Sequence, residues 1–296
     1  MSMRKHRSKI QFAIKLDSMQ VTSHQIGVIG TASFDILHVA GNVMHTIGGA
    51  GLYTALAAHQ AGATTRLIAP RPEPLPQLFA PVIERVQWSG PVVTPDALPR
   101  LEIEHHGQGR ATLLDASWGA ETELTPDILS IDKQPMDMIH IAALSSAQRQ
   151  LEFVQAIRAM KNQKIATLIS VGTYARLVDR ETEVVRQLFQ LADYFFMNEN
   201  EALGLFGTID RARTRPEALL CVTLGDQGAL VIEGDRVTHV PANAVDERDP
   251  TGAGDTFCGA TLAGLARELT PVEAARRAVE WAAQTVGDIG PASLLR

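Results

Sequence analysis

The chain has 296 residues, of which 45% are hydrophobic and 20% are charged, with a formal net charge of −6. This composition is ordinary for a globular protein with a large core, and the length suits one large domain or two small ones. The net charge gives no general reason to expect nucleic-acid binding, and no apolar run approaches the roughly 18 residues that cross a membrane. Cys221 and Cys258 lie far apart in apolar runs. We interpret them as buried free thiols in a reducing compartment, which indicates the cytoplasm.

The start of the chain differs in composition from the rest. Basic residues from Arg4 to Lys15 precede the first acidic residue, Asp17. The apolar residues there are too interrupted for a secretory signal. We therefore expect residues 1–24 to form a flexible basic extension and residues 25–296 to form the folded domain.

From residue 26 onward, short strand-like runs alternate with segments of helical periodicity. The predicted strands cover 26–30, 64–69, 138–144, 165–171, 194–197 and 219–224. The predicted helices cover 52–60, 147–161, 181–192, 198–206, 256–268 and 271–286. This alternation indicates an α/β fold in which helices cover both faces of a doubly wound, mostly parallel sheet.

Hairpin patterns interrupt this rhythm. Alternating runs at 98–106 and 110–116 are joined by Gly107-Gln108-Gly109, and residues 229–240 turn at Gly234-Asp235. With the segment about 36–47, the hairpin about 98–117 is expected to form a small separate sheet. Exposed strands of such a sheet could pair between two chains, so a homodimer is one expectation.

The segment Asp249-Pro-Thr-Gly-Ala-Gly-Asp255 carries the clearest chemical signal. Gly252, Ala253 and Gly254 leave the backbone nearly bare, so a ligand can approach their amides. The helical pattern that follows places these amides at a helix N-terminus, which favours an anion. The Asp255 carboxylate can there accept a proton from a hydroxyl that attacks a bound phosphoryl group. The alternative is that Asp255 is an ordinary helix cap after a glycine turn.

Other polar or glycine-rich positions fall near the carboxyl ends of predicted strands, where open α/β sheets bind ligands. They are Asp35, Gly48, Gly49, Asn198, Glu201, Thr223, Gly225 and Gly228. Each has a purely structural alternative: Asn198 and Glu201 suit a capping box, and the two glycine pairs suit a hairpin turn and a strand break. Their joint occurrence at matching strand ends favours one shared ligand site.

Several other chemistries lack their motifs. The chain has no Gly-x-x-x-x-Gly-Lys-Ser/Thr and no Gly-x-Gly-x-x-Gly after the first strand. This argues against a Walker P-loop and a nicotinamide-dependent oxidoreductase. Gly-x-Ser-x-Gly and His-Glu-x-x-His are also missing from the sequence. We interpret His105, His106 and His140 as structural or solvated residues rather than ligands.

Taken in order from about residue 25, these motifs resemble the PfkB, or ribokinase-like, family of carbohydrate and nucleoside kinases. Residues 249–255 resemble its C-terminal signature, and Gly30 with Asp35, Gly48-Gly49, Asn198-x-x-Glu201 and Thr223-x-Gly225-x-x-Gly228 resemble its other motifs. The resemblance implies a doubly wound α/β domain with a small β-sheet lid, formed here by segments about 36–47 and 98–117.

The resemblance also implies a role for each motif. Asp255 would be the general base, and the amides of Gly252, Ala253 and Gly254 would form the anion hole. Asn198 and Glu201 would hold Mg²⁺ through water near the phosphates of ATP, and Thr223, Gly225 and Gly228 would line the nucleotide site. Asp35, Gly48 and Gly49 would contact acceptor hydroxyls. Asp249 and Thr251 would lie near a monovalent cation such as K⁺, as in some members.

The chain departs from the family pattern on the acceptor side. Tyr53 stands where many members carry an Asn that reaches the sugar, and residues 139–144 contain no acid, although some sugar-specific members have one there. The ring and hydroxyl of Tyr53 suit a nucleoside base or a different polyol equally well. We expect an ATP-dependent kinase that phosphorylates a hydroxyl of a sugar, polyol or nucleoside, without membrane or nucleic-acid partners. The alternative is a regulator on the same fold that binds nucleotide or sugar without transfer.

Overall fold

The computed structural model describes residues 24–107, 110–131, 135–160 and 167–296. The expected basic extension, up to residue 23, lies outside these ranges. The strands are β1 (Gln25–Ile29), β2 (Ser33–Val39), β3 (Asn42–Gly48), β4 (Thr64–Ile68), β5 (Arg71–Pro72), β6 (Gln87–Ser89), β7 (Val92–Val93), β8 (Arg100–Gly107), β9 (Arg110–Ser117), β10 (Met138–Ile141), β11 (Leu168–Gly172), β12 (Tyr194–Asn198), β13 (Leu219–Thr223), β14 (Ala229–Glu233) and β15 (Arg236–Val240). The α-helices are α1 (Ala50–Gln60), α2 (Ala80–Ile83), α3 (Ile128–Ile131), α4 (Ala147–Met160), α5 (Ala175–Arg180), α6 (Thr182–Leu191), α7 (Glu199–Phe206), α8 (Ala253–Ala266) and α9 (Pro271–Val286).

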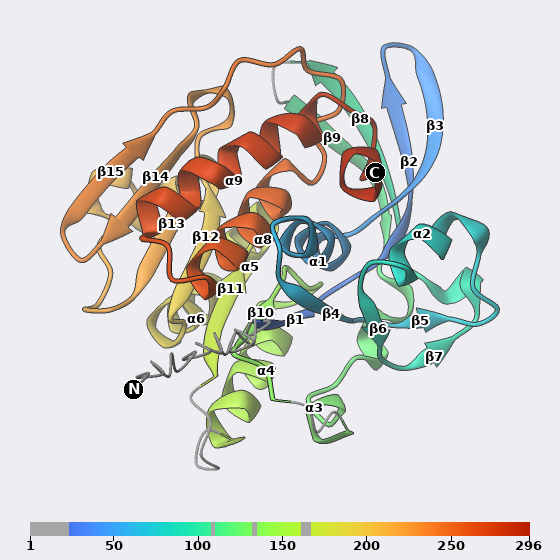
Figure 1. Cartoon of the computed structure of the whole chain (residues 1–296), viewed down its shortest axis with the longest axis horizontal. Helices are drawn as coiled ribbons and strands as arrows, with labels where there is room; N and C mark the ends of the chain where they lie inside the picture. Colours follow the sequence, from blue (N-terminus) through green and yellow to red (C-terminus); the bar gives the residue numbers. More distant parts are fainter. Residues whose placement is uncertain (1–23, 108–109, 132–134, 161–166) are drawn as a thin grey trace, which may run out of the picture.

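A nine-stranded sheet runs through the molecule in the order β15-β14-β13-β12-β11-β10-β1-β4-β6 (Figure 1). Neighbours from β6 to β13 are parallel, and β13, β14 and β15 pair antiparallel. The chain moves outward from β1 to β4 and β6, and then returns to place β10 on the other side of β1. Such a reversal opens a crevice at the carboxyl ends of the strands.

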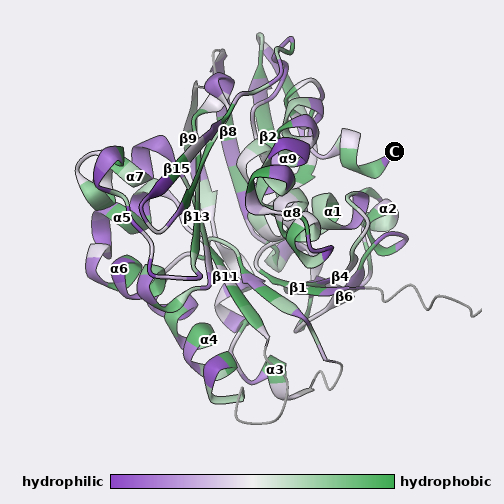
Figure 2. Ribbon diagram, turned by 60° about the vertical axis from the view of Figure 1, so that its left-hand side comes forward, coloured by the Kyte–Doolittle hydropathy of each residue, from purple (hydrophilic) through white to green (hydrophobic). Residues whose placement is uncertain are grey.

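Helices cover both faces of this sheet. Buried side chains of α1, α8 and α9 form one hydrophobic cluster with the sheet, and those of α4, α5, α6 and α7 form another. Figure 2 shows outer helices such as α6 and α9 mixing hydrophilic and hydrophobic residues, as expected for helices with one face in solvent. The expected α/β class, with a large mostly parallel sheet and a smaller sheet besides, is confirmed.

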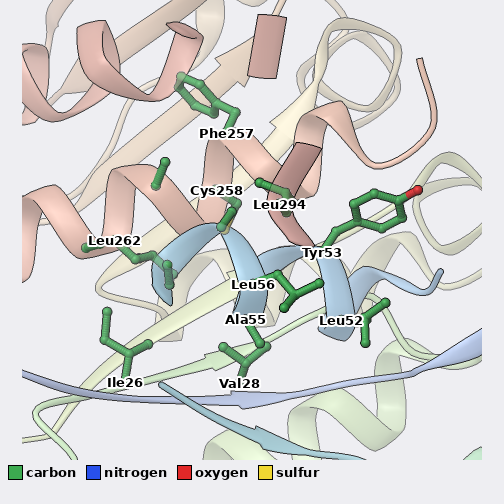
Figure 3. Packing of buried hydrophobic residues seen from close by; sticks show 14 of the residues in the cluster. Ile26, Val28, Leu52, Tyr53, Ala55, Leu56, Phe257, Cys258, Leu262 and Leu294 are labelled. Carbon is green, nitrogen blue, oxygen red and sulfur yellow. The ribbon is translucent and has the colours of Figure 1, made fainter. Parts of the chain in front are cut away.

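Helices α1 and α8 are buried on nearly all sides and pack closely against each other. Residues 51–58 of α1 and 256–264 of α8 are all buried. A Cβ atom on Gly259 would lie 2.2 Å from the carbonyl oxygen of Thr54, so the two backbones meet with no side chain between them. Figure 3 shows α1 between β1, which carries Val28, and α8, which carries Cys258.

The smaller sheet has the strand order β3-β2-β8-β9. Its strand β2 begins at Ser33, three residues before the segment about 36–47 that was expected to contribute to this sheet. Asp35 therefore lies within a strand of the smaller sheet and not in a loop after β1. Ser33 and Asp35 are buried, whereas Phe34 between them and Ile36 after them are partly exposed. Since polar residues occupy the buried positions, the hydropathy pattern concealed the start of the strand.

Other boundaries also differ from the expected ones. Helix α8 begins at Ala253, so Asp255 lies in its first turn, and Gly252 is the N-cap residue. Helix α5 was not expected at all. Among the helices in the described part of the chain, none combines the length and apolar character of a membrane span.

The contact between α1 and α8 predicts a strong effect of Gly259→Ala on stability. The new methyl group would overlap the Thr54 carbonyl oxygen, and overpacking of this kind costs about 1–3 kcal/mol in unfolding free energy. Gly254→Ala in the same helix is the matched control, because its Cβ would meet no atom within 4 Å. Urea denaturation should show a lower free energy of unfolding for Gly259→Ala only. Equal stability of the two variants would contradict close packing at Gly259.

Candidate active site

A cavity of about 300 Å³ opens at the carboxyl ends of the parallel strands. Its walls come from both halves of the chain. Of the residues expected at a ligand site, the cavity is lined by Asp35, Gly49, Tyr53, Asn198, Glu201, Thr223, Thr251, Gly252, Gly254 and Asp255. Gly48, Ala253, Gly225, Gly228 and Asp249 are not on its wall.

The turn before α8 presents backbone to this cavity. Gly252 has a positive φ of 74°, and a Cβ there would lie 2.4 Å from the ring of Tyr53. Both facts require glycine at this position. The amide of Ala253 donates to the carbonyl oxygen of Pro250 at 3.3 Å, while Gly252 and Gly254 face the cavity. The first-turn amides of α8 make this wall suited to an anion.

Asp255 occupies the first turn of α8 and lines the cavity. No side-chain hydrogen bond caps this helix, so the interpretation of Asp255 as an N-cap residue is wrong. Burial raises the pKa of the Asp255 carboxyl from 3.8 to about 7. Its backbone carbonyl accepts a hydrogen bond from the Thr54 hydroxyl of α1 at 3.3 Å. The arrangement places a carboxyl with a pKa near neutrality in the first turn of a helix whose N-terminal amides suit an anion.

Asp35 projects from β2 into the same cavity and is 2% exposed. The Ser33 hydroxyl donates to its Oδ1 at 2.6 Å, while Oδ2 is buried without a hydrogen-bond partner. Burial raises the pKa of Asp35 to about 7, the Ser33 hydrogen bond opposes this rise, and the charge of Asp249 adds to it. A Cβ on Gly48 would lie 1.8 Å from Oδ2, so only glycine fits next to this carboxyl.

Tyr53 lines the same cavity as these two carboxyl groups. Its side chain is buried, its ring packs on Gly252, and its hydroxyl has no hydrogen-bond partner among the described residues. Burial, then the charges of Asp249, Asp35 and Asp255, raise the pKa of the phenol well above its usual value. The hydroxyl is therefore a neutral donor or acceptor available to a ligand.

Asn198 and Glu201 connect β12 to α7 through a complete capping box. The Asn198 side chain accepts from the Glu201 amide at 3.0 Å, and Glu201 Oε2 accepts from the Asn198 amide at 2.8 Å. The same residues line the cavity, so the capping and ligand interpretations are both compatible with the structure. Burial, reinforced by the charge of Asp255, raises the pKa of Glu201 to about 8 despite its hydrogen bonds with Asn198.

Thr223 ends β13 on the cavity wall, but the glycines that follow it do not line the cavity. Gly225 and Gly228 have positive φ angles and form the turn from β13 to β14. These two glycines therefore lie in a hairpin turn, as one of the two interpretations of the sequence predicted.

Asp249 is buried under the turn that leads into α8. Its Oδ1 accepts the Thr251 amide at 2.9 Å, and its Oδ2 accepts the Gly290 amide at 2.7 Å. The carboxylate thus joins the turn to the C-terminal segment of the chain.

Sequence reasoning missed an aromatic part of the wall. Trp118 follows β9 and Tyr174 follows β11, and their rings lie 6.1 Å apart at an interplanar angle of 44°. Thr173, beside Tyr174, contributes a buried hydroxyl that has no partner in the described chain. Tyr174 and Thr173 stand at the carboxyl end of a strand, so the rule that found Asn198 could have found them. Trp118 carried no comparable signal.

His140 lies on the cavity wall beside Cys258. Its Nδ1 is 2.8 Å from the Ser170 hydroxyl, and Cys258 Sγ is 3.7 Å from both ring nitrogens. Burial lowers the pKa of His140 to about 3, so the imidazole is neutral at physiological pH.

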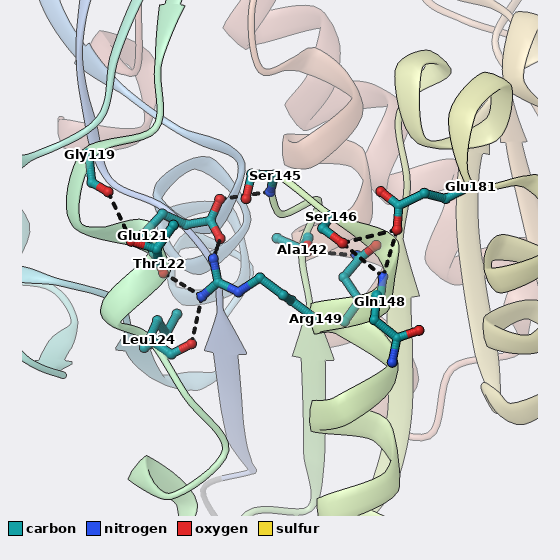
Figure 4. A network of polar contacts seen from close by, with 11 residues as sticks. Gly119, Glu121, Thr122, Leu124, Ala142, Ser145, Ser146, Gln148, Arg149 and Glu181 are labelled. Atoms are coloured by element: carbon teal, nitrogen blue, oxygen red, sulfur yellow. Dashed lines mark hydrogen bonds and ion pairs between the residues drawn. The ribbon is translucent and has the colours of Figure 1, made fainter.

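A buried ion pair holds the segment that carries Trp118 (Figure 4). The carboxylate of Glu121, which is fully buried, pairs with Arg149 of α4 and accepts the Ser145 amide at 2.7 Å. Arg149 also donates to the carbonyl oxygen of Leu124 at 2.8 Å. Since both charges are satisfied by several groups, the pair fixes the chain after β9 against the large sheet's helices.

Comparison with known proteins identifies the family. The model of the pfkB family of carbohydrate kinases matches residues 18–296. The chain therefore belongs to this family, and the expected enzyme class, a PfkB-type kinase, is confirmed. A cytidine kinase from Thermococcus kodakarensis is 25% identical over 279 residues, which cover 90% of this chain and 98% of that protein. A deoxyribokinase from Salmonella typhi is 31% identical over 188 residues, 59% of each chain.

Solved structures share the fold at lower identity. A nucleoside kinase from Burkholderia thailandensis in complex with inosine has a TM-score of 0.74 and 17% identity, with 90% of this chain and 92% of that chain covered. A ribokinase from Cryptococcus neoformans in complex with ADP has a TM-score of 0.73 and 18% identity, with 92% and 97% covered.

The raised pKa of Asp35 predicts that stability falls as the pH rises. Below about pH 4 the carboxyl is protonated in both the folded and unfolded states; between pH 4 and 7 only the folded state keeps the proton. The shift corresponds to roughly 4 kcal/mol of unfolding free energy that is lost progressively as the pH rises from about 4 to about 7. Melting temperatures from pH 4 to 8 should fall less steeply for Asp35→Asn than for the unaltered chain, and identical slopes would contradict a buried protonated Asp35.

Proposed function

We propose that this protein transfers the γ-phosphoryl group of ATP to a hydroxyl of a small, uncharged acceptor, with Asp255 as the general base. The observation that carries the proposal is the position of Asp255, whose carboxyl has a pKa of about 7 and shares a cavity wall with Gly252 and Gly254. A base with a pKa near the working pH is the most effective one. Membership of the pfkB family supports the proposal.

The transfer would proceed in line. Asp255 takes the proton of the acceptor hydroxyl as its oxygen attacks the γ-phosphorus; the bond from that phosphorus to the β,γ-bridging oxygen breaks, and ADP leaves with that oxygen. The glycine amides of the turn stabilise the charge on the transferred group. Positioning of the two substrates and this charge stabilisation supply most of the catalysis. The smaller sheet, from segments about 36–47 and 98–117, would act as a lid that excludes water.

The acidic groups of the cavity fit a magnesium ion bound with ATP. Asp35, Glu201 and Asp255 line the cavity, and no Lys or Arg is among the described residues that line it. Oxygen donors from one or two side chains, with water and phosphates, are the ligands that Mg²⁺ prefers. Asn198 and Glu201 would hold the ion through water, and the ion would supply positive charge that offsets the charge of the phosphates. Thr223 and the turn with Gly225 and Gly228 would border the nucleotide.

The same charge balance favours an uncharged acceptor. A phosphate or carboxylate group on the acceptor would lie among carboxyl groups without a cationic partner, which is costly in a buried site. On the acceptor side, the unpartnered Asp35 Oδ2 and Tyr53 hydroxyl suit substrate hydroxyls. Gly48 and Gly49 allow the backbone to approach closely.

The rings of Trp118 and Tyr174 favour a nucleoside as that acceptor. A nucleobase is planar and uncharged and can stack on an aromatic side chain. The relatives that support this choice include a cytidine kinase and a nucleoside kinase bound to inosine. A free sugar is the second candidate, because deoxyribokinase and ribokinase are also among the similar proteins.

Replacement of the base tests the reaction. Asp255→Asn should lower kcat by about 10²- to 10⁴-fold while ATP binding persists, because general base catalysis contributes a factor of this size. ATP consumption is measured against nucleosides, free sugars and polyols, with Mg²⁺ present. A panel in which no acceptor gives turnover above that of Asp255→Asn would leave only the nucleotide-binding regulator as an interpretation.

Replacement of Trp118 tests the acceptor class. Loss of one stacking partner costs about 1–3 kcal/mol, so Trp118→Ala should raise KM for a nucleoside by about 10- to 100-fold. Trp118→Phe should restore most of the affinity, because it keeps an aromatic face. Trp88→Phe is the matched control, since Trp88 packs on Phe79 away from the cavity. An unchanged KM for Trp118→Ala, or turnover of free sugars alone, would exclude the nucleoside.

A further inference from the structure

His105 of the smaller sheet reaches the turn that precedes α8. Its Nε2 lies 3.2 Å from Asp249 Oδ1 and 3.1 Å from the Thr251 hydroxyl. The side chains of His105 and Asp249 are 4% and 1% exposed, so solvent does not weaken this contact. The contact joins β8 to residues about 145 positions later in the chain.

The chemistry of the partners assigns the hydrogen on this imidazole. Asp249 in its ionised form offers only acceptors, so Nε2 carries the hydrogen that points to Oδ1. Asp249 then accepts N–H groups from three segments: Thr251 in the turn, Gly290 near the C-terminus and His105 in the smaller sheet. His105 Nδ1 is buried and has no partner among the described residues.

This arrangement does not fit the monovalent cation expected at Asp249 and Thr251. A K⁺ ion is held by oxygen atoms that replace its hydration shell. Here a side-chain oxygen of each residue lies within hydrogen-bond distance of His105 Nε2, the nitrogen that carries the hydrogen in this assignment. A donor and a cation cannot use the same lone pairs together.

We propose that His105 takes the place of the monovalent cation in this protein. Its imidazole braces residues 249–251 and thereby holds the turn in the shape that presents Gly252 and Gly254 to the cavity. His105 acts through the turn and is thus a positioning residue. The proposal rests on the proposed function in assigning the turn to phosphoryl transfer.

The position of His105 has a second consequence. A free cation would brace the turn whatever the position of the smaller sheet, whereas an imidazole on β8 does so only when that sheet lies against the turn. The anion-binding turn would therefore be complete only with the smaller sheet in place. Transfer would be coupled to enclosure of the acceptor, which limits hydrolysis of ATP by water.

Cation dependence of turnover is the first test. The full chain is assayed with Mg²⁺ and saturating substrates in KCl, NaCl, CsCl or choline chloride at one ionic strength. We expect kcat of the unaltered chain to vary less than twofold among these salts. His105→Ala should lower kcat about tenfold or more in choline chloride, since it removes a partner of a buried charged group, and KCl should restore part of the loss. His105→Gln, which keeps an N–H donor, should retain more activity than His105→Ala.

Thermal melting without substrates is the second test, and it does not require turnover. K⁺ should raise the melting temperature of His105→Ala relative to choline, because binding to the folded state alone stabilises it. The unaltered chain should show no such rise. His106→Ala is the matched control: its side chain is exposed, and its Nε2 lies 2.8 Å from the Thr112 hydroxyl of the neighbouring strand β9. It should behave like the unaltered chain in both tests.

Either of two results would overturn the proposal. The first is a response of the unaltered chain to K⁺, seen as several-fold activation or as a clear rise in melting temperature. The second is identical behaviour of His105→Ala and His106→Ala in both tests. If His105→Ala does not fold, the activity of His105→Gln and the response of the unaltered chain to K⁺ still test the proposal. Failure of the proposed function would abolish turnover in every variant, and the melting experiment would then decide the role of His105 alone.

Discussion

The close approach of α1 and α8 is the constraint on which the rest of the structure depends. Gly259 lets the backbone of α8 reach the Thr54 carbonyl, and Thr54 in turn bonds the Asp255 carbonyl. The N-terminal ends of the two helices therefore meet at one cavity, with the Tyr53 ring packed on Gly252. Larger side chains at the glycine positions would separate the helices and move the cavity wall that carries Tyr53 away from Asp255.

The carboxyl groups of the cavity carry an electrostatic cost that the fold alone does not relieve. Asp35, Glu201 and Asp255 all have raised pKa values, with burial as the largest cause in each. Stability is sacrificed at functional sites of many proteins in this way. In the proposed reaction the relief would come with the substrates, because Mg²⁺ would supply the positive charge that the described cavity wall lacks.

Two buried polar contacts are among those that join the smaller sheet, and the segment just after it, to the remainder of the chain. Glu121, just after β9, pairs with Arg149 of α4, and His105 of β8 contacts Asp249 before α8. Both contacts are buried, so breaking either would remove a side-chain partner from a buried carboxylate. The first contact fixes the segment that carries Trp118, and the second braces the anion-binding turn in the proposed mechanism. In the proposed mechanism, the position of the smaller sheet is thereby linked both to the wall near Trp118, which would bind the acceptor, and to the turn before α8, which would bind the phosphoryl group.

Local patterns in the sequence determined the α/β class and most of the strands and helices. They also singled out residues 249–255 and 198–201 as candidate site segments. Both were possible because helix periodicity, glycine turns and capping boxes involve neighbours in the chain. The tertiary structure decided what depends on distant residues. It placed Asp35 in β2, where buried polar residues reverse the usual hydropathy pattern. It left Gly225 and Gly228 off the cavity wall, paired Trp118 with Tyr174, and brought His105 to Asp249. No local propensity encodes these contacts, since each arises only when packing of the sheet and helices brings separate segments together.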